Sequence, residues 1–487
     1  MTRLYEKYRE KIMTAEEAAK LVKADMTLGF SGFTMVGYPK AVPKAMAELG
    51  EAKNLTVLTG ASVGQGLDGV LAEAGLTARR FPYQTNKSIR DAINRGEVLY
   101  ADQHLSHTAM FLNRGVGPKV DIAIIECVAV TEEGLVPAAT VGNSETYVRL
   151  ADKVIVELNE ALPLELSGMH DIYYPSVTNE PVPLTGVMDR IGTPFIPCPE
   201  EKIAAIVMTS DPGDYPKFKA ADEDSKRIAE NIVNFLKKEV EEGRQPETLA
   251  PLQSGVGSVA NAVLSGLSIS GFKGLKMFTE VIQDSALNLI RDGIIDGASC
   301  TSLSLSEEAQ KEMFDNIEYY RQRVVIRPQE VSNMPELARR LGLIAMNTPI
   351  ECDIYGNVNS THIMGTKVMN GIGGSGDFAR NAGLSIFATS SVAKGGDISC
   401  IVPFCSHIDH TEHDVQVIVT EQGVADLRWK SPRERAIAII ENCAHPDYRP
   451  MLKEYFDEAL ALGGQTPHVL SKALSWHQRF LETGTMK

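Results

Sequence analysis

Short apolar runs alternate with segments of helical periodicity in the first half of the chain. The runs are rich in valine and isoleucine, and they read NLTVLTGAS (54–62), VDIAIIECVAV (120–130), ADKVIVELN (151–159) and KIAAIVM (202–208). Near-continuous apolar strands between helices are typical of parallel sheets that are covered on both faces. We therefore predict an α/β fold for this half.

The second half repeats the alternation after a polar linker. The linker TSDPGDYPKFKAADEDSK (209–226) is rich in Pro, Gly, Asp and Lys. It leads into a predicted helix over 225–243, in which apolar residues recur every four positions until Gly243. Further strand-like runs are GLKMFTEVI, RVVIRPQEV, LSIFATSSVA, ISCIVPF and VQVIVTEQG. We place a domain boundary in the linker, which predicts α/β domains over residues 1–212 and 213–487.

Composition and charge narrow the class of protein. A chain of 487 residues with 44% hydrophobic residues is too long for one core, which agrees with two domains. Its net charge of -15 argues against nucleic acid or an anionic membrane as the main partner. The seven cysteines are scattered without a CxxC pair, as expected for buried thiols in a reducing compartment. The charged N-terminus and the lack of a membrane-length apolar run predict a cytoplasmic protein.

One carboxylate interrupts the apolar run GLKMFTEVIQDSA (274–286). The neighbours of Glu280 suggest a strand buried on both faces, which leaves little room for a glutamate that faces solvent. Ligands of open parallel sheets bind beyond the carboxyl ends of the strands, so Glu280 is a candidate site residue. Three roles remain open here: an exposed strand residue, a general base or a covalent nucleophile. A thioester would suit a carboxylate nucleophile, because its thiolate leaves with a pKa of about 8 to 9.

Two glycine-rich segments could present backbone N–H groups to an anion. NGIGGSGDFARN (370–381) is the densest glycine cluster, and it contains neither GxxxxGK[ST] nor GxGxxG after a strand, which disfavours nucleoside triphosphates and dinucleotides. In PLQSGVGSVANAVLSGL, Gly255 and Gly257 precede a predicted amphipathic helix whose free amides suit phosphate or a carbonyl oxygen. A tight turn and a plain helix start are the structural alternatives.

The segment CSHIDHTEHD (405–414) resembles a metal site at first sight. His407, His410 and His413 are spaced three apart, which suits a metal if the segment is helical. It lies between two strand-like runs and contains no HExxH, so a hydrogen-bonded polar turn is the favoured interpretation.

Three further polar residues are candidates with structural alternatives. Asn333 in SNMPELARRLG fits a helix N-cap with Pro335 in the first turn, and a substrate contact is compatible with that role. Lys394 in SSVAKGGD follows a strand, where a lysine is more often solvated unless an anionic ligand lies nearby. Glu421 ends the run VQVIVTEQG, at the kind of position where ligands bind.

Several spaced motifs together resemble the acetyl-CoA hydrolase/transferase family of class I CoA-transferases. They are, in order, FSGFT, LTGAS, PYQT, DRIG, QSGVGSVANAV, FTEVIQD, RPQEVSN, YGNVNSTH, NGIGGSGDFARN, CSHIDHTEHD and VTEQGVADL. The resemblance runs over essentially the whole chain. It implies two tandem open α/β/α domains, a homodimer, and no metal or organic prosthetic group, with coenzyme A and its thioesters as substrates.

The resemblance also implies roles for individual residues. Glu280 would form a γ-glutamyl-CoA thioester, and the amides of Val256 and Gly374 would stabilise the oxyanion. Asn333 and Glu421 match active-site positions. The positions expected to bind coenzyme A are Gly255, Val256, Gly257, Ser258, Val259, Asn370, Gly374 and Lys394.

The expected activity is CoA transfer between an acyl-CoA and a short-chain carboxylate, with succinyl-CoA and either acetate or propionate as the first pairs to test. Three alternatives remain. An acyl-CoA hydrolase would release thiol without an acceptor, and a metal-dependent hydrolase would lose activity to chelators. A non-catalytic CoA-binding module would tolerate replacement of Glu280.

Overall fold

The computed structural model describes residues 2–177, 180–218 and 220–487. The chain divides into two compact units. Unit 1 comprises Met1–Lys217, Met277–Asp284 and Asp296–Leu337, and unit 2 comprises Phe218–Lys276, Ser285–Ile295 and Ala338–Lys487. The boundary predicted at 212/213 lies close to the first of these divisions, but unit 1 also contains two later segments because their strands and helices pack within it. Lys219 in the predicted linker lies outside the described residues.

Unit 1 contains a nine-stranded, mainly parallel sheet with the order β4-β3-β2-β1-β5-β6-β8, in which β7 pairs with β5 and with β9. Among the described strands of this sheet, the pairs β5–β6 and β6–β8 are antiparallel and the others are parallel. The predicted buried runs form β2, β5, β7 and β9. The strands are β1 (Thr27–Phe30), β2 (Leu55–Leu58), β3 (Thr77–Phe81), β4 (Leu99–Tyr100), β5 (Ile122–Val130), β6 (Gly134–Pro137), β7 (Lys153–Asn159), β8 (Ile196–Pro197) and β9 (Ile203–Thr209).

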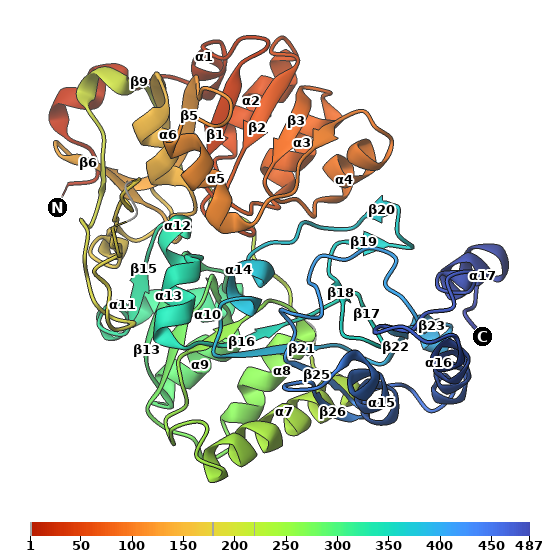
Figure 1. Ribbon diagram of the computed structural model, residues 1–487. Coiled ribbons are helices and arrows are strands. Elements are labelled where there is room, and N and C mark those ends of the chain that lie inside the picture. Colours follow the sequence, from red (N-terminus) through yellow and green to blue (C-terminus); the bar gives the residue numbers. More distant parts are fainter. Residues whose placement is uncertain (1, 178–179, 219) are drawn as a thin grey trace. The chain divides into compact units, whose positions relative to one another are not determined.

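Helices cover both faces of this sheet (Figure 1). On one face, Leu28 and Phe30 of β1 pack with apolar residues of α1, α2 and α3. On the other face, Gly29 lies against Tyr147 of α6, where a Cβ atom would approach the ring to 2.5 Å. Successive residues of β1 therefore pack against helices on opposite faces of the sheet. The helices are α1 (Ala15–Ala19), α2 (Ala41–Leu49), α3 (Val70–Glu73), α4 (Lys87–Asn94), α5 (Leu105–Asn113) and α6 (Ser144–Leu150).

Unit 1 also contains short elements from the later part of the chain. The parallel pairs β12–β14 and β13–β15 belong to it, with helices between them. The chain passes between the units within β11, α9, β13 and α13. The bounds are β11 (Leu275–Phe278), β12 (Val281–Ile282), α9 (Asp284–Arg291), β13 (Ile295–Cys300), β14 (Ser302–Leu303), α10 (Glu307–Asp315), α11 (Ile317–Arg321), β15 (Val324–Ile326), α12 (Gln329–Ser332) and α13 (Pro335–Leu341).

Unit 2 is built on the parallel strands β10, β16, β21 and β25, with β26 antiparallel to β25. The predicted helix over 225–243 is α7, which lies beside α8 (Figure 1). The side chain of Asp222 caps its start through the N–H of Ser225 at 2.8 Å, and Gly243 follows its end at a φ of +71°. The main elements are α7 (Glu223–Glu241), β10 (Leu252–Ser254), α8 (Ser258–Leu267), β16 (Ile344–Asn347), α14 (Ser375–Ala379), β21 (Leu384–Ala388), β25 (Val417–Thr420), β26 (Gly423–Asp426), α15 (Pro432–Asn442), α16 (Arg449–Leu462) and α17 (Ser475–Thr483).

Unit 2 also contains small separate sheets of short strands. The runs LSIFATSSVA and ISCIVPF, each predicted as one strand, both divide into two elements because the chain turns within them. The short strands are β17 (Glu351–Asp353), β18 (Val358–Asn359), β19 (His362–Ile363), β20 (Lys367–Val368), β22 (Val392–Ala393), β23 (Ile398–Ser399) and β24 (Ile401–Val402). The parallel sheets and their helical layers confirm the predicted α/β fold class.

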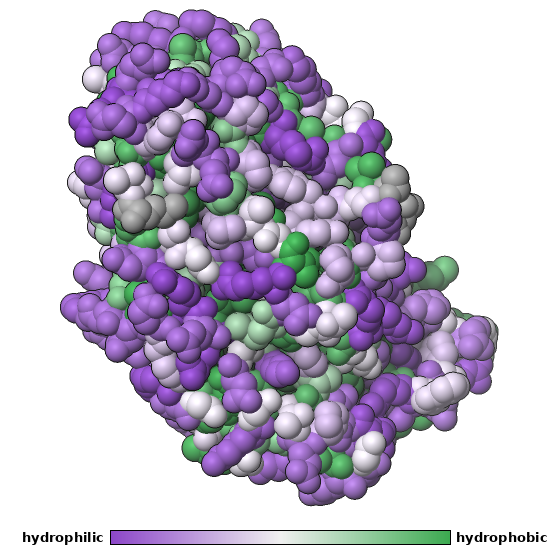
Figure 2. Space-filling view, turned by 90° about the vertical axis from the view of Figure 1, so that its left-hand side faces the viewer, coloured by the Kyte–Doolittle hydropathy of each residue, from purple (hydrophilic) through white to green (hydrophobic). Residues whose placement is uncertain are grey.

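The surface and the thiols agree with the composition. Hydrophilic residues dominate the face in Figure 2, and apolar residues appear there as separate patches. All seven cysteines are buried free thiols. No helix within the described residues is sufficiently long and apolar to span a membrane.

Candidate active site

Glu280 belongs to unit 1 and lies at a break between two short strands, β11 and β12. The run GLKMFTEVI was predicted as one strand, but β11 ends at Phe278 and β12 begins at Val281. The backbone carbonyl of Glu280 accepts the N–H groups of Thr301 at 2.8 Å and Ser302 at 3.1 Å. These bonds to Thr301, which follows β13, and to Ser302, which begins β14, hold the turn. The position of the Glu280 side chain is therefore fixed by long-range contacts.

Asn333 holds the carboxylate of Glu280. Its Nδ2 donates a hydrogen bond to Oε1 of Glu280 at 2.7 Å. Asn333 directly follows α12, and its own Oδ1 is buried with no hydrogen-bond partner among the described residues. The prediction that Asn333 caps the following helix is therefore wrong, because its amide is directed to Glu280 and its oxygen accepts nothing from α13.

The surroundings of Glu280 change its proton affinity. Desolvation by the surrounding chain raises the pKa of the half-buried Glu280 to about 7, and the hydrogen bond from Asn333 opposes that rise. The next residue, Val281, belongs to an apolar cluster with Phe33, Ala61, Leu105 and Tyr83. Burial and the charge of Glu280 raise the pKa of Tyr83. A carboxyl group of this kind is present both as acid and as carboxylate near neutral pH.

Two buried acids close to α12 were missed by the sequence analysis. Burial raises the pKa of Glu145 on α6 to about 8, and the charge of Glu330 on α12 adds to that rise. Desolvation raises the pKa of Glu330 to about 7, against the opposing charge of Arg149. Glu330 also accepts a hydrogen bond from Nδ2 of Asn113 at 3.3 Å. Glu330 belongs to the motif RPQEVSN and lies three residues before Asn333. This spacing could have identified Glu330 as a candidate from the sequence.

The segment from Gly255 to Val259 begins a helix in unit 2, as predicted. Gly255 follows β10 and donates its N–H to the carbonyl of Met346 at 2.9 Å. Gly257 has a φ of +112° at the N-cap of α8, which favours glycine, and Ser258 and Val259 form the first turn. Val256 between the two glycines is 48% exposed. The loop thus presents an apolar side chain and its neighbouring amides at a helix N-terminus.

The segment 370–381 forms a turn before a short helix, also in unit 2. Nδ2 of Asn370 donates to the carbonyls of Ser360 at 2.9 Å and Gly371 at 2.8 Å. Gly373 has a φ of +61°, and Gly374 is the N-cap residue of α14. Gly373 therefore adopts a left-handed backbone conformation that favours glycine, and the amide of Gly374 lies at the start of α14.

Glu421 and Lys394 differ in their burial and in their contacts. The carboxylate of Glu421 is buried and accepts the N–H of Ser391 at 2.8 Å, the hydroxyl of Ser391, and Nε2 of Gln422 at 2.8 Å. Lys394 is exposed, and its Nζ lies 4.9 Å from the ring centroid of Phe480. Of the predicted site residues, only Glu280 and Asn333 are joined by a described hydrogen bond.

The three histidines of the segment 405–414 have separate partners. His410 is buried and its Nε2 lies 2.9 Å from Oγ of Ser375, whereas Nε2 of His407 lies 3.2 Å from Oδ1 of Asp409. His413 is exposed. The segment is a loop, as predicted, and within the described part of the chain no three His, Cys, Asp or Glu residues are grouped to hold a metal ion.

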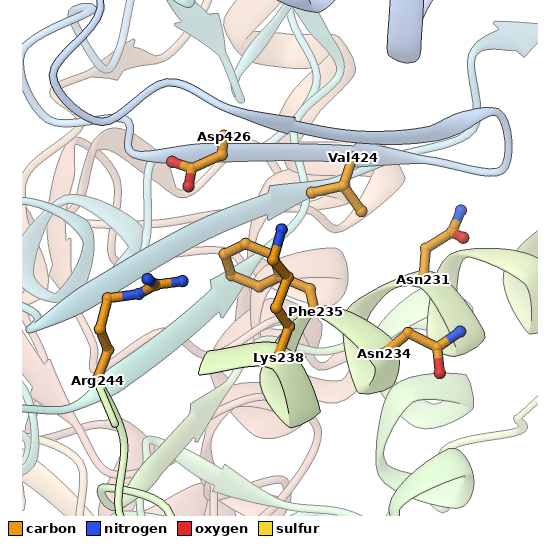
Figure 3. A pocket seen from close by; sticks show the side chains of 7 residues that line it. All are labelled: Asn231, Asn234, Phe235, Lys238, Arg244, Val424 and Asp426. Carbon is orange, nitrogen blue, oxygen red and sulfur yellow. The ribbon is translucent and has the colours of Figure 1, made fainter. Parts of the chain in front are cut away.

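A separate pocket of about 340 Å³ lies between α7 and β26 (Figure 3). None of the predicted site residues lines it, and its two cations are paired, Arg244 with Glu239 at 2.6 Å and Lys238 with Glu242 at 3.8 Å. We assign it no role in the chemistry. Its lining residues are Asn231, Asn234, Phe235, Lys238, Arg244, Val424 and Asp426.

Comparisons with known proteins cover nearly the whole chain. The acetyl-CoA hydrolase/transferase N-terminal domain matches residues 1–208, and the C-terminal domain of the same family matches residues 309–456. A succinyl-CoA:acetate CoA-transferase of Clostridium kluyveri is 57% identical over 99% of this chain and 91% of that protein. A propanoyl-CoA:succinate CoA transferase of Escherichia coli is 44% identical over 97% and 98% of the two chains. An acetyl-CoA hydrolase of Yarrowia lipolytica is 43% identical over 99% and 97%.

A solved structure shares the fold. RipA from Yersinia pestis superposes with a TM-score of 0.74 at 24% identity, over 94% of this chain and 99% of that one. At this identity the likeness concerns the fold alone. Because both family domains match and relatives 43 to 57% identical align along nearly the whole chain, the protein belongs to the acetyl-CoA hydrolase/transferase family.

Proposed function

We propose that the protein is an acyl-CoA:carboxylate CoA-transferase that works by ping-pong exchange through a thioester on Glu280. The observation that carries the proposal is the half-buried carboxyl group of Glu280, held by Asn333 at 2.7 Å with a pKa raised to about 7. Succinyl-CoA with acetate or propionate is the proposed substrate pair, because relatives named for these substrates are 57% and 44% identical.

The first half-reaction uses Glu280 as nucleophile. Its carboxylate attacks the thioester carbonyl, the C–S bond breaks, and a mixed anhydride and CoA thiolate result. The thiolate then attacks the glutamyl carbonyl, which releases the donor carboxylate and leaves CoA as a thioester on Glu280. The second carboxylate repeats these steps in reverse and departs as the new acyl-CoA.

The raised pKa of Glu280 favours the first step. An ordinary glutamate, with a pKa near 4.3, is a far weaker base than the CoA thiolate that it must displace. A pKa of about 7 reduces this difference by an amount on the order of 3 kcal/mol. The hydrogen bond from Asn333 orients one oxygen, which leaves the other available for attack.

The family resemblance assigns the remaining functions of the reaction to further residues of the chain. On the family resemblance, the amides of Val256 and Gly374 stabilise the oxyanion, each contributing about 3 kcal/mol. The segment from Gly255 to Val259, together with Asn370 and Lys394, would bind coenzyme A, and the exposed cation of Lys394 suits its phosphates. Glu421 would act by holding the Ser391 turn near Lys394. We propose a cytoplasmic homodimer without a metal or organic prosthetic group, which light scattering and metal analysis of the purified protein would test.

Acyl-CoA hydrolysis is the second candidate function. The relative from Yarrowia lipolytica, named an acetyl-CoA hydrolase, is 43% identical over nearly the whole chain. Both reactions would share the glutamyl thioester and differ in whether water reaches it. A hydrolase would release thiol from acyl-CoA without a carboxylate acceptor, whereas a transferase would require the acceptor.

The decisive experiment traps the intermediate. The enzyme is incubated with acyl-CoA and no acceptor, treated with borohydride or hydroxylamine, and digested for mass spectrometry. We expect a modification on Glu280, and none in a Glu280→Ala variant. An unmodified Glu280 in the wild type, together with transferase activity in the variant, would refute the mechanism. Comparison of kcat/KM across acceptor carboxylates then identifies the substrate pair.

A further inference from the structure

Two adjacent residues of the histidine-rich segment 405–414 are connected to opposite ends of one glycine-rich turn, His410 directly and Asp409 through Ser360. The segment takes no part in the reaction proposed above. Nevertheless, the side chain of Asp409 is only 7% exposed, and His410 is 2% exposed. Buried polar side chains normally have specific partners, and the partners of these two lead to Asn370 and Ser375, at the two ends of the turn.

Asp409 is connected to Asn370 through one short piece of chain. Oδ2 of Asp409 accepts the N–H of Ser360 at 2.6 Å, and both carboxylate oxygens accept the hydroxyl of Thr361 at 2.9 Å. The carbonyl of Ser360 in turn accepts Nδ2 of Asn370 at 2.9 Å. Asp409 therefore fixes the backbone on which the side chain of Asn370 rests.

His410 is connected directly to the first residue of α14. Its Nε2 lies 2.9 Å from Oγ of Ser375, the residue after Gly374. The hydroxyl of Ser375 donates its only proton to the carbonyl of Ile372 at 2.8 Å. Nε2 of His410 must therefore carry a proton and donate it to Ser375.

The ring of His410 is itself held in place. Its backbone exchanges hydrogen bonds with Val358 at 2.8 and 3.1 Å, and its ring centroid lies 5.0 Å from that of Phe387 on β21. The turn that it contacts is intrinsically adaptable, since Gly371, Gly373 and Gly374 lie within it and α14 has only five residues. Such a turn needs anchors from outside to hold one amide in place.

We propose that Asp409 and His410 are positioning residues with separate effects, Asp409 on the binding of coenzyme A through Asn370 and His410 on the oxyanion-stabilising amide of Gly374. The assignment rests on the proposed function, in which Asn370 contacts coenzyme A and Gly374 donates to the oxyanion. One motif thereby controls affinity at one end of the turn and catalysis at the other.

The kinetic test is a split between KM and kcat. Asp409→Ala should raise the KM for acyl-CoA about tenfold, the effect of one lost hydrogen bond, with kcat changed less than about threefold. His410→Leu should lower kcat about 100-fold, as expected when an oxyanion donor is displaced, and leave KM within about threefold. His410→Gln should restore most of kcat, because its amide nitrogen can donate to Ser375 from a similar position.

Controls separate positioning from general damage. Ser375→Ala should resemble His410→Leu, and the double variant should lose no further activity, because both remove one interaction. His413→Ala is the matched control, since His413 lies in the same segment and is exposed. Its kinetics and thermal stability should equal those of the wild type.

Hydrogen exchange and calorimetry test the proposal without any turnover. Amide exchange in a peptide covering 371–379 should accelerate in His410→Leu, and calorimetry with coenzyme A should show the weaker binding only in Asp409→Ala. Equal changes of KM and kcat in both variants, or unchanged exchange in His410→Leu, would overturn the proposal. A wild type without CoA transfer would refute the proposed function, whereas exchange and calorimetry would still decide the positioning roles.

Discussion

Glu280 and Glu421 have similar local sequences and very different surroundings. Each follows a threonine at the end of a buried apolar run, in MFTEV and IVTEQ. Among the described contacts, the carboxylate of Glu421 accepts three hydrogen bonds, from the backbone and hydroxyl of Ser391 and from Gln422. The carboxylate of Glu280 accepts one, from Asn333.

The difference shows which surroundings give a carboxylate a structural role and which leave it able to react. A carboxylate with several short donors is stabilised as an anion and has few lone pairs left for a reaction. One that is desolvated with a single donor is more basic, and one of its oxygens remains available. We therefore expect Glu421 to stabilise its turn and Glu280 to react.

Replacement of Glu280 is the strongest test of the contrast between Glu280 and Glu421. Glu280→Gln keeps the shape of the side chain but removes the nucleophile, and we expect transferase activity to fall by at least about 10⁴-fold. The measurement is steady-state transfer, with the thermal midpoint as a check of folding. Activity within tenfold of the wild type would show that Glu280 is a structural residue.

Asn333→Ala tests whether the single donor matters. We expect kcat/KM to fall about 100-fold, because the carboxylate loses its orientation. The hydrogen bond lowers the pKa of Glu280, so its loss should move the acidic limb of the pH–rate profile upward by about one unit.

Asn316 provides the matched control for that variant. It is an exposed asparagine of unit 1 whose Nδ2 donates to the backbone carbonyl of Glu312 at 2.9 Å, within its own helix turn. Asn316→Ala should leave the acidic limb in place. If the acidic limb shifted equally in Asn333→Ala and Asn316→Ala, Asn333 would have no specific effect on the pKa of Glu280.

Replacement of Glu145 tests how a buried carboxyl group with an unpaired oxygen affects the free energy of unfolding. Its Oε2 is buried without a hydrogen-bond partner in the described part of the chain, and burial raises its pKa to about 8. Since the folded pKa exceeds the unfolded value, the wild type loses stability as the pH rises from about 4.5 to above 8. Glu145→Gln does not titrate, so its advantage in denaturant unfolding should grow over that window, to an amount on the order of 5 kcal/mol at pH 9.

The opposite sign is expected for Glu239 in unit 2, which provides the contrast to Glu145. Desolvation would raise its pKa, but hydrogen bonds from Arg428 and Arg244 lower it to about 2. Its contribution should therefore be present above pH 4.5 and lost as the pH falls toward 2. The measurement is denaturant unfolding of Glu239→Gln and Glu145→Gln across pH. If stability relative to the wild type changed with pH in the same direction in both variants, hydrogen-bond partners would not decide the direction of the pKa shift.

Glu421→Gln should have the smallest effect on the reaction. The amide keeps one acceptor for Ser391, so we expect a stability loss of about 1–2 kcal/mol and an activity loss of about tenfold or less. Denaturant unfolding and kcat measure the two. A loss of activity as large as that of Glu280→Gln would place Glu421 in the chemistry itself.

Local patterns predicted the elements whose causes are local. Continuous apolar runs predicted β5 and β7, and a four-residue apolar repeat ending at Gly243 predicted α7. The break at Glu280 escaped prediction, because the bonds that hold the turn come from Thr301 and Ser302, about twenty residues later. The capping role of Asn333 failed for a similar reason, since its partner lies 53 residues earlier in the chain.

By itself the sequence determined the α/β class, the family and the candidate nucleophile, because these depend on apolar periodicity and on motifs read along the chain. Only the tertiary structure decided that Asn333 holds Glu280, that Glu421 accepts hydrogen bonds from Ser391, and that Asp409 and His410 anchor the glycine-rich turn. Each of these depends on a contact between residues distant in sequence. Such contacts also set the desolvation and the hydrogen bonds of a carboxyl group, and so they decide which glutamate can react.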